Sequence, residues 1–174
     1  MTEKRALVTG AGKRLGREMA LFLARRGHDV AVHYNGTADG ATETVADIER
    51  MGRRAVALQA DLLDAAQMAT LVPRAAEGLG GPWTVLVNNA SIFEHDTMRS
   101  ATAESWQRHM DSNLRAPFVL LQHFAEQAPR AFNDHEGEPL SQALAVNMID
   151  QRVWKLTPEF MTYTLAKSAL WTLT

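Results

Sequence analysis

One stretch near the N-terminus restricts the possible folds more than any other. An apolar run at residues 6–8 leads into glycines at positions 10, 12 and 16, and an amphipathic segment follows at residues 15–26. This order predicts strand, tight turn and helix. Glycines let a backbone bend close to a pyrophosphate, and the N–H groups at a helix start favour negative charge. The stretch predicts a dinucleotide-binding turn; the alternative is a turn that binds nothing.

The rest of the chain repeats this alternation of short apolar runs with amphipathic segments. Further strands are predicted at residues 29–34, 55–58, 85–87 and 143–149, and helices at 37–52, 64–78, 104–127 and from about 159. Strands that alternate with helices in short steps imply right-handed crossovers. The prediction is an α/β chain with a doubly wound parallel sheet, a Rossmann fold, and a single domain over residues 1–174.

Composition excludes several functional classes. The formal net charge of −2 argues against nucleic acid or an anionic membrane as the main partner. No segment approaches the length of a membrane span. There is no cysteine, so disulfides and thiolate catalysis are excluded, and a cytoplasmic setting is expected. The six histidines show no metal-ligand spacing, so no metal site is predicted.

Five elements occur in the order and spacing of one known family. They are Thr9-Gly10 with Gly16, Asp61-Leu62, Asn88-Asn89-Ala90, Asn113, and Tyr163 followed four residues later by Lys167. Together they resemble the short-chain dehydrogenase/reductase family over the whole chain. That family continues with two more strands and a substrate-covering segment. We therefore expect the C-terminal part of the family fold to be missing from this sequence.

Tyr163 and Lys167 are candidate catalytic residues because a spacing of four places them on one helix face. A phenol has a pKa of about 10, and a nearby ammonium group favours the phenolate and lowers that pKa. By resemblance, Tyr163 transfers a proton, Lys167 also holds the nicotinamide ribose, and Asn113 holds a water in the proton relay. The alternatives are a surface tyrosine with a solvated lysine, and an asparagine used only in packing.

The family resemblance also implies a cofactor site, in which Asp61 meets the adenine unless it only caps a turn. No carboxylate follows the second predicted strand to repel a 2′-phosphate, and Lys13 or Arg14 can reach toward one. NADPH is therefore expected over NADH. The predicted cofactor-binding residues are Gly10, Lys13, Arg14, Leu15, Gly16, His33, Tyr34, Asn35, Thr37, Asp61, Leu62, Asn89, Ala90, Ser91 and Lys167.

Two departures from the family pattern point to one branch of it. Asp150 stands where the usual catalytic serine lies, and Arg14 replaces the middle glycine of the turn. Both resemble the pteridine reductase branch, as does Phe93, whose counterpart stacks on the pterin ring. Asp150 is therefore a predicted catalytic residue, unless it only caps the loop at Gln151. Phe93 and Ser91 are predicted to contact substrate.

The leading hypothesis is an NADPH-dependent oxidoreductase that acts on a small molecule, a pterin in its sharper form. Two alternatives stay open: a carbonyl reductase for an oxoacyl thioester, sugar or diketone, and a non-catalytic nucleotide sensor. By resemblance, a homotetramer or homodimer is expected. A partner could cover the apolar face of the long helix, or that face could meet the chain's own sheet; its residues are Leu114, Phe118, Leu121 and Phe124.

Overall fold

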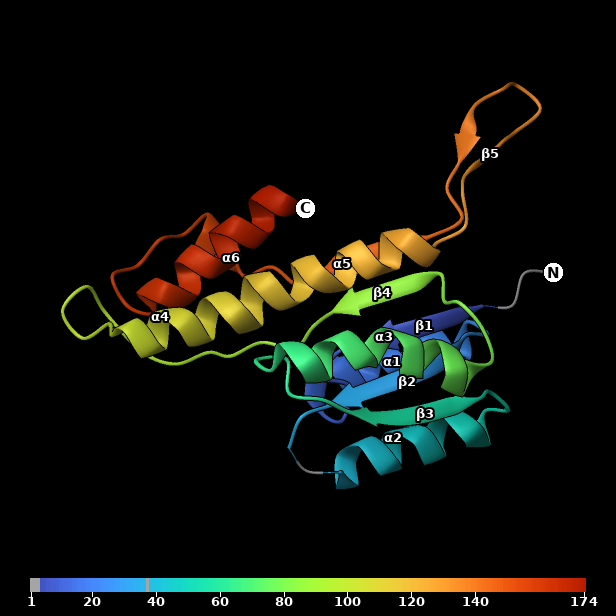
Figure 1. Ribbon diagram of the computed structural model, residues 1–174, viewed down its shortest axis with the longest axis horizontal. Helices are drawn as coiled ribbons and strands as arrows, with labels where there is room; N and C mark the ends of the chain where they lie inside the picture. Colours follow the sequence, from blue (N-terminus) through green and yellow to red (C-terminus); the bar gives the residue numbers. More distant parts are fainter. Residues whose placement is uncertain (1–3, 37) are drawn as a thin grey trace.

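A five-stranded parallel sheet forms the centre of the molecule (Figure 1). The computed structural model describes residues 4–36 and 38–174. In chain order the strands are β1 (Arg5–Val8), β2 (Asp29–Tyr34), β3 (Ala55–Gln59), β4 (Val85–Asn88) and β7 (Leu144–Asn147). Their spatial order is β3-β2-β1-β4-β7. The chain therefore winds outward in one direction from β1 and then in the other, which confirms the predicted doubly wound sheet.

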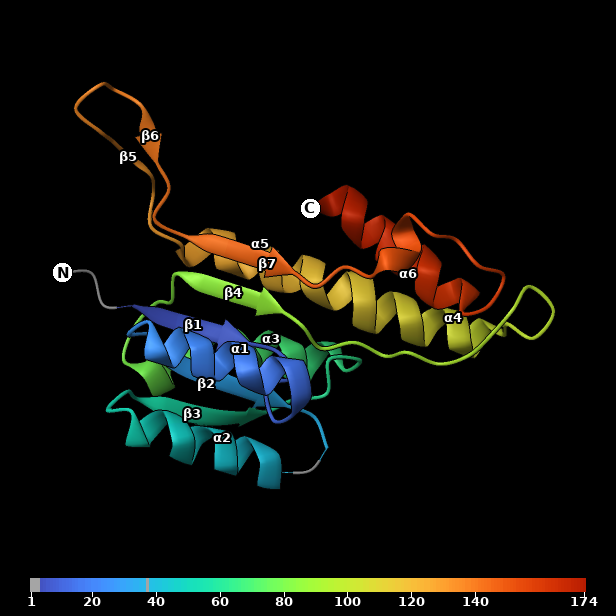
Figure 2. The ribbon, with the colours of Figure 1, turned by 180° about the vertical axis from the view of Figure 1, so that it is seen from behind.

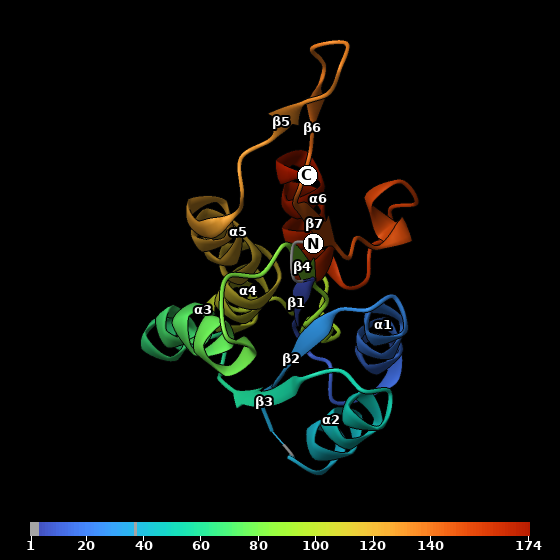
Figure 3. The same ribbon diagram turned by 90° about the vertical axis from the view of Figure 1, so that its right-hand side faces the viewer.

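Helices cover both faces of this sheet. They are α1 (Arg14–Arg25), α2 (Asp39–Arg50), α3 (Ala65–Leu79), α4 (Ala103–Met110), α5 (Ala116–Gln127) and α6 (Met161–Leu173). Viewed end-on, α1 and α2 lie on one side and α3 and α5 on the other (Figure 3). The period-two alternation of a strand divides the core accordingly. Leu7 packs on one side with Trp83 and Leu120, whereas Val8 packs on the other with Ile48.

The point where the strand order reverses lies between β1 and β4. β1 pairs with β2 on one side and with β4 on the other, and all three run parallel. Their carboxyl ends therefore meet at one edge of the sheet. In open α/β sheets, ligands bind at such a switch point. The glycine turn follows β1 directly at this edge, as the sequence predicts.

The long predicted helix over residues 104–127 is interrupted by a π-helical segment, η1 (Asp111–Arg115). Pro117 lies in the first turn of α5 and has no N–H, so it cannot donate an α-helical bond to the carbonyl of Asn113. In this segment the helix has the wider π-helical turn, and the N–H of Ala116 bonds to the carbonyl oxygen of Asp111. Such segments occur often at functional sites, and Asn113 lies within this one.

Helix starts agree with the prediction in one case and differ in two. Asp64 caps α3, and its side chain accepts hydrogen bonds from the N–H groups of Ala66 and Gln67. α2 begins at Asp39, two residues after the predicted start at Thr37, and Thr37 lies outside the described residues. α6 begins two residues after the predicted Glu159, because Phe160 adopts a left-handed backbone with a φ of 56°.

The segment between α5 and β7, for which the sequence predicts no helix or strand, contains a small hairpin. Its strands are β5 (Phe132–Asn133) and β6 (Pro139–Leu140), and it projects away from the sheet (Figure 2). Asp134 accepts hydrogen bonds from two backbone N–H groups of the turn, which closes it. Within the described residues, no helix is both long and apolar enough to span a bilayer.

Candidate active site

The glycine turn after β1 is closely packed, and Gly16 in particular has no room for a side chain. A Cβ on Gly16 would lie 2.2 Å from the carbonyl oxygen of Gly10, and Gly10 itself has a φ of 64°. A Cβ on Gly40 would lie 2.2 Å from the oxygen of Gly12. Gly40 was not a predicted site residue, because its contact joins α2 to a turn almost thirty positions earlier. These contacts bring the turn and two helices into one rigid edge.

The start of α1 is open on its outer side. Lys13 is the N-cap, and its side chain, which has no hydrogen-bond acceptor, leaves the first N–H groups of the helix without a side-chain cap. Lys13, Arg14 and Leu15 are all exposed. Arg14 has a φ of 51°, a conformation that favours glycine, which explains why the related family has glycine there. The turn combines positive charge with free backbone donors, and both suit a phosphate.

His33, predicted to bind the cofactor, lies beneath the turn with 1% of its surface exposed. Its Nδ1 accepts a hydrogen bond from the backbone N–H of Gly10 at 3.1 Å, so Nε2 carries the proton and donates to the oxygen of Ala60 at 3.0 Å. Burial lowers the pKa of His33 to about 4. In the structure His33 supports the turn from below, and a direct contact with the cofactor stays a prediction.

The segment that follows β4 closes against the glycine turn. The Thr9 hydroxyl oxygen accepts hydrogen bonds from the N–H groups of Asn89 and Ala90, at 2.9 and 3.0 Å. The Asn89 amide in turn donates to the carbonyl oxygens of Thr9 and Gly10. These bonds tie the ends of β1 and β4 together. Asn89 and Ala90 therefore lie beside Gly10, as their predicted shared role requires.

The other predicted cofactor residues lie along the same edge of the sheet. Tyr34 ends β2 half-buried, and Asn35 is exposed. Asp61 accepts a hydrogen bond from the N–H of Leu63 at 2.9 Å, so its side chain caps a turn, and its contact with the adenine stays a prediction. Leu62 is buried in the core on the α3 side, and its contact with a cofactor stays a prediction. Thr37 lies outside the described residues.

Tyr163, Asp150 and Lys167 come together at the carboxyl end of β7. The Tyr163 hydroxyl donates to Oδ2 of Asp150 at 3.0 Å, while Oδ1 accepts the N–H of Arg152 at 2.9 Å. Asp150 therefore caps its loop with one oxygen and meets the phenol with the other. Lys167 is buried and donates to the carbonyl oxygen of Met148 at 2.7 Å. Burial lowers the pKa of Lys167 to about 8.

The expected lowering of the Tyr163 pKa by Lys167 is not found. Burial of the phenol and its hydrogen bond to Asp150 raise the pKa of Tyr163 instead. The Lys167 ammonium nitrogen lies 5.9 Å from the centre of the Tyr163 ring and is bonded to a backbone carbonyl. The sequence shows a shared helix face, but it does not show which carboxylate the hydroxyl meets. The phenol is therefore held in its neutral, proton-carrying form.

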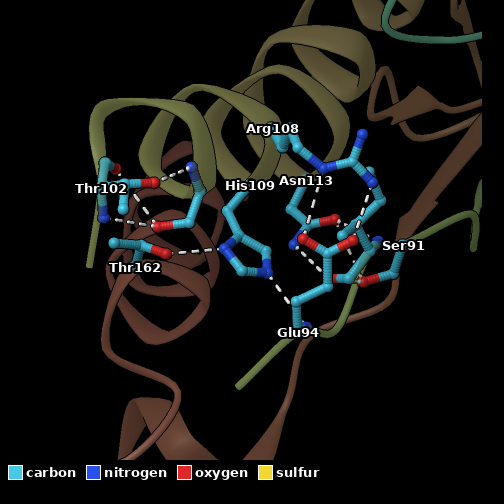
Figure 4. A network of polar contacts seen from close by, with 9 residues as sticks. Ser91, Glu94, Thr102, Arg108, His109, Asn113 and Thr162 are labelled. Carbon is cyan, nitrogen blue, oxygen red and sulfur yellow. Dashed lines mark hydrogen bonds and ion pairs between the residues drawn. The ribbon is translucent and has the colours of Figure 1, made fainter. Parts of the chain in front are cut away.

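Asn113 and Ser91 meet, and Ser91 also interacts with the Tyr163 hydroxyl, where it opposes the larger effects of burial and Asp150 on the pKa of the phenol. Oδ1 of Asn113 accepts hydrogen bonds from the Ser91 hydroxyl at 3.1 Å and from the Ile92 N–H at 2.9 Å, and its amide donates to the Ile92 oxygen at 2.8 Å (Figure 4). Asn113 thus fixes the segment that follows β4. Its predicted water in the relay stays a prediction.

Aromatic side chains line the outer side of the candidate site. Phe93 is 52% exposed and stacks on Phe160, with ring centres 4.1 Å apart and planes at 5°. It also meets the Tyr163 ring edge-to-face at 4.7 Å. The Arg152 guanidinium lies 4.7 Å from the centre of the Phe160 ring. Phe93 is thus next to the phenol, as its predicted substrate role requires, and Phe160 and Arg152 are neighbours that no sequence motif indicates.

Comparison with known proteins agrees with this geometry. The family profile for short chain dehydrogenase matches residues 4–174. The chain is 37% identical over 123 residues to the hydroxynaphthalene reductase-like protein Arp2 of Metarhizium robertsii, covering 71% of this chain and 46% of that protein. It is 35% identical over 127 residues to the 3-oxoacyl-(acyl-carrier-protein) reductase FabG of Staphylococcus aureus, covering 73% and 51%. The chain therefore spans about half the length of these curated relatives.

A solved structure provides a geometric parallel. The FolM alternative dihydrofolate reductase 1 from Brucella suis, in complex with NADP, superposes with a TM-score of 0.87 at 37% identity, covering 98% of this chain and 64% of that one. The present chain has features that such a dinucleotide needs: a turn in which a Cβ on Gly16 would collide with the backbone, and a helix start with exposed Lys13 and Arg14. The chain belongs to the short-chain dehydrogenase/reductase family.

Proposed function

We propose that the protein is an NADPH-dependent reductase in which Tyr163 gives a proton to the substrate. The observation that supports this most is the meeting of Tyr163 and Asp150 next to Lys167, at the same edge of the sheet as the glycine turn. A sensor needs the turn but not a neutral, buried phenol beside a carboxylate. The structural relative with bound NADP supports the choice of cofactor.

Each part of the site has its own task in this proposal. The turn and the start of α1 hold the pyrophosphate, and Lys13 or Arg14 reaches toward a 2′-phosphate. Lys167 holds the nicotinamide ribose. A bound nicotinamide supplies the hydride. The Tyr163 hydroxyl then gives its proton to the atom that becomes negative, and the phenolate regains a proton from water.

The substrate we propose is a dihydropterin, whose reduced bond is C=N. Hydride adds to the carbon and the nitrogen takes the proton, so no oxyanion has to form beside the Asp150 carboxyl group. Phe93 offers an exposed flat surface for a bicyclic ring. The dihydrofolate reductase title of the Brucella relative supports this choice, whereas FabG and Arp2 support a carbonyl substrate as the second candidate.

A substrate panel tests these proposals on the full-length protein. Dihydropterins, oxoacyl thioesters and diketones are added in turn, and NADPH oxidation is followed by absorbance. Turnover of dihydropterins at the highest kcat/KM is expected. Turnover of carbonyl compounds alone would support the second candidate, and tight NADPH binding without any turnover would favour the sensor. The same assays with NADH should show lower efficiency; equal efficiency would contradict the cofactor preference.

We further propose a homotetramer or homodimer that acts in the cytoplasm. The predicted apolar face is divided in the structure: Phe124 packs inside the chain against Trp83, whereas Phe118 is 43% exposed. Phe118 and Leu114 line an apolar hollow of about 400 Å³ together with Leu173 of α6. A second copy could cover this hollow. Light scattering at micromolar concentration is expected to show a dimer or tetramer, and a monomer would contradict the proposal.

A further inference from the structure

A buried polar chain lies directly beside the candidate active site, and the proposed reaction does not use it. It joins Asp96 from the segment after β4, His109 from the last turn of α4, and Thr162 from the first turn of α6. Figure 4 shows the contact between His109 and Thr162. All three side chains are at least 98% buried. Buried polar groups are costly unless they are paired, so these hydrogen bonds offset the cost of burying the three side chains.

The direction of every hydrogen bond in the chain is determined. The N–H of Glu94 donates to Nε2 of His109 at 3.2 Å, so the ring proton is on Nδ1. Nδ1 lies 2.6 Å from the Thr162 hydroxyl oxygen and donates to it. The Thr162 hydroxyl in turn donates to Oδ2 of Asp96, which also accepts the Ser105 hydroxyl at 3.2 Å. A neutral His109 is required, and burial lowers its pKa, which favours that form.

The polar chain of Asp96, His109 and Thr162 also caps the N-terminus of α6. Phe160, the N-cap, makes no side-chain cap of its own. Asp96, from the segment after β4, caps the helix instead. Its Oδ1 accepts a hydrogen bond from the N–H of Thr162 at 3.1 Å, and its backbone carbonyl oxygen accepts one from the N–H of Met161 at 3.4 Å. Tyr163 is the next residue, and its ring lies edge-to-face to His109 with centres 6.0 Å apart. The position of the phenol therefore depends on Asp96 and His109.

We propose that His109, Thr162 and Asp96 are positioning residues that fix the Tyr163 hydroxyl opposite Asp150. The proposal rests on the proposed function to the extent that Tyr163 carries the proton. The same bonds hold the segment that bears Phe93, so the phenol and the aromatic surface are set in place together. A shift of about 1 Å in such a group can lower a rate by about 100-fold.

Two substitutions at one position separate positioning from simple packing. Thr162→Val keeps the shape of the side chain and removes the hydroxyl, whereas Thr162→Ser keeps the hydroxyl. We expect Thr162→Val to lower kcat about 10- to 100-fold with the KM for NADPH unchanged, and to move the alkaline limb of the kcat–pH profile. Thr162→Ser should stay within a few-fold of the wild type. An unaltered kcat and pH profile in Thr162→Val, or an equal loss in Thr162→Ser, would overturn the proposal.

A measurement that needs no turnover keeps this test independent of the proposed function. In protein labelled with ¹³C-tyrosine, the Tyr163 signal is assigned by its loss in Tyr163→Phe, and its titration is followed by NMR. Thr162→Val should titrate at lower pH than the wild type, because the displaced hydroxyl loses Asp150. An unchanged titration would overturn the positioning role. A shifted titration in a protein that reduces no substrate would support positioning and contradict the proposed reaction.

Two further variants complete the design. His109→Phe removes both ring hydrogen bonds at similar volume and should reproduce the shift, which covers the case that Thr162→Val does not fold. Arg108→Gln is the matched control, because Arg108 lies next to His109 and binds the Glu94 carboxylate at 2.7 Å, on the exposed side of the same segment. Its kcat and Tyr163 titration should match the wild type. An equal shift in Arg108→Gln would show that any loosening of this segment suffices, and would overturn the specific role.

Discussion

The two halves of the candidate site are built in different ways. Around the glycine turn, the contacts are between backbone atoms and small or neutral side chains, such as Thr9 and Asn89, held by short bonds to main-chain atoms. Around Tyr163, the contacts are between charged and aromatic side chains, including Asp150 and Arg152. The first half fixes a shape, whereas the second sets a protonation state. We therefore expect changes in the two halves to affect different measurements.

The largest expected effect is in the second half. Tyr163→Phe keeps the ring that packs against Phe93 and removes the hydroxyl bonded to Asp150. Loss of a positioned proton donor typically lowers a rate by about 10² to 10⁴. Reduction should fall by that factor, while the Kd for NADPH, measured by fluorescence titration, stays nearly unchanged. Activity within a few-fold of the wild type would show that another group carries the proton.

The second effect concerns the turn and its response to acid. The pKa of His33 is about 4 in the folded protein and 6.5 in its ordinary state, so the unfolded chain binds more protons between these values. The contribution of neutral His33 to the free energy of unfolding is therefore fully present above pH 6.5. It is lost as the pH falls toward 4, a change of about 3 kcal/mol in total. Urea unfolding at pH 7 and pH 4.5 measures this loss.

A variant isolates the His33 contribution from that of the carboxylates. His33→Asn offers Gly10 an acceptor near the position of Nδ1 but cannot take up a proton. Its free energy of unfolding should fall less between pH 7 and pH 4.5 than that of the wild type. Equal slopes for the two proteins would show that His33 is not the group responsible.

The third prediction concerns a substitution that changes the shape of the glycine turn. A Cβ in Gly16→Ala would lie 2.2 Å from the Gly10 oxygen and 2.5 Å from the Asn89 amide nitrogen. The turn has to shift, at a cost of about 1 to 3 kcal/mol, and the Kd for NADPH should rise at least about tenfold. Gly36→Ala is the control, because a Cβ there meets no atom within 4 Å. Equal affinity in both variants would contradict the steric account.

The same contrast explains what the sequence could predict. Much of the turn is encoded locally: Gly10 has a φ of 64°, Gly16 lies against the Gly10 oxygen six residues away, and Asp29–Tyr34 is a strand at its predicted bounds. The doubly wound sheet follows from alternating periodicity, which is also local. The hairpin of β5 and β6 was missed, because its two-residue strands are too short to show a period.

The half of the site around Tyr163 depends on contacts between distant segments, and the sequence shows only its separate residues. The spacing of Tyr163 and Lys167 predicts one helix face, but not that Asp150 accepts the phenol and raises its pKa. His109 and Asp96 were missed because each resembles an ordinary polar residue until the fold places them against Thr162. A buried polar partner is recognisable only in three dimensions.

The smallest expected effect is a difference between substrates, and it depends on Asp150. Its two oxygens have separate partners, the Arg152 N–H and the Tyr163 hydroxyl, so a single serine hydroxyl can replace only one of them. A serine suits a ketone, because it can donate to the developing oxyanion, which a carboxylate would repel. A nitrogen that needs a proton is better served by the pair of Tyr163 and Asp150. Asp150→Ser should therefore lower dihydropterin turnover about tenfold more than that of a simple ketone.

A second substitution separates charge from shape in this test. Asp150→Asn keeps an acceptor for the Arg152 N–H but removes the carboxylate that the Tyr163 hydroxyl meets, so it should also lose dihydropterin turnover, whereas the loop at Gln151 keeps its cap. kcat/KM for one dihydropterin and one ketone, measured in both variants, gives the comparison. Dihydropterin turnover retained in Asp150→Ser would refute the substrate assignment, as would a wild type that reduces only ketones. A loss of equal size for both substrates would reduce Asp150 to a partner that holds Tyr163 in place.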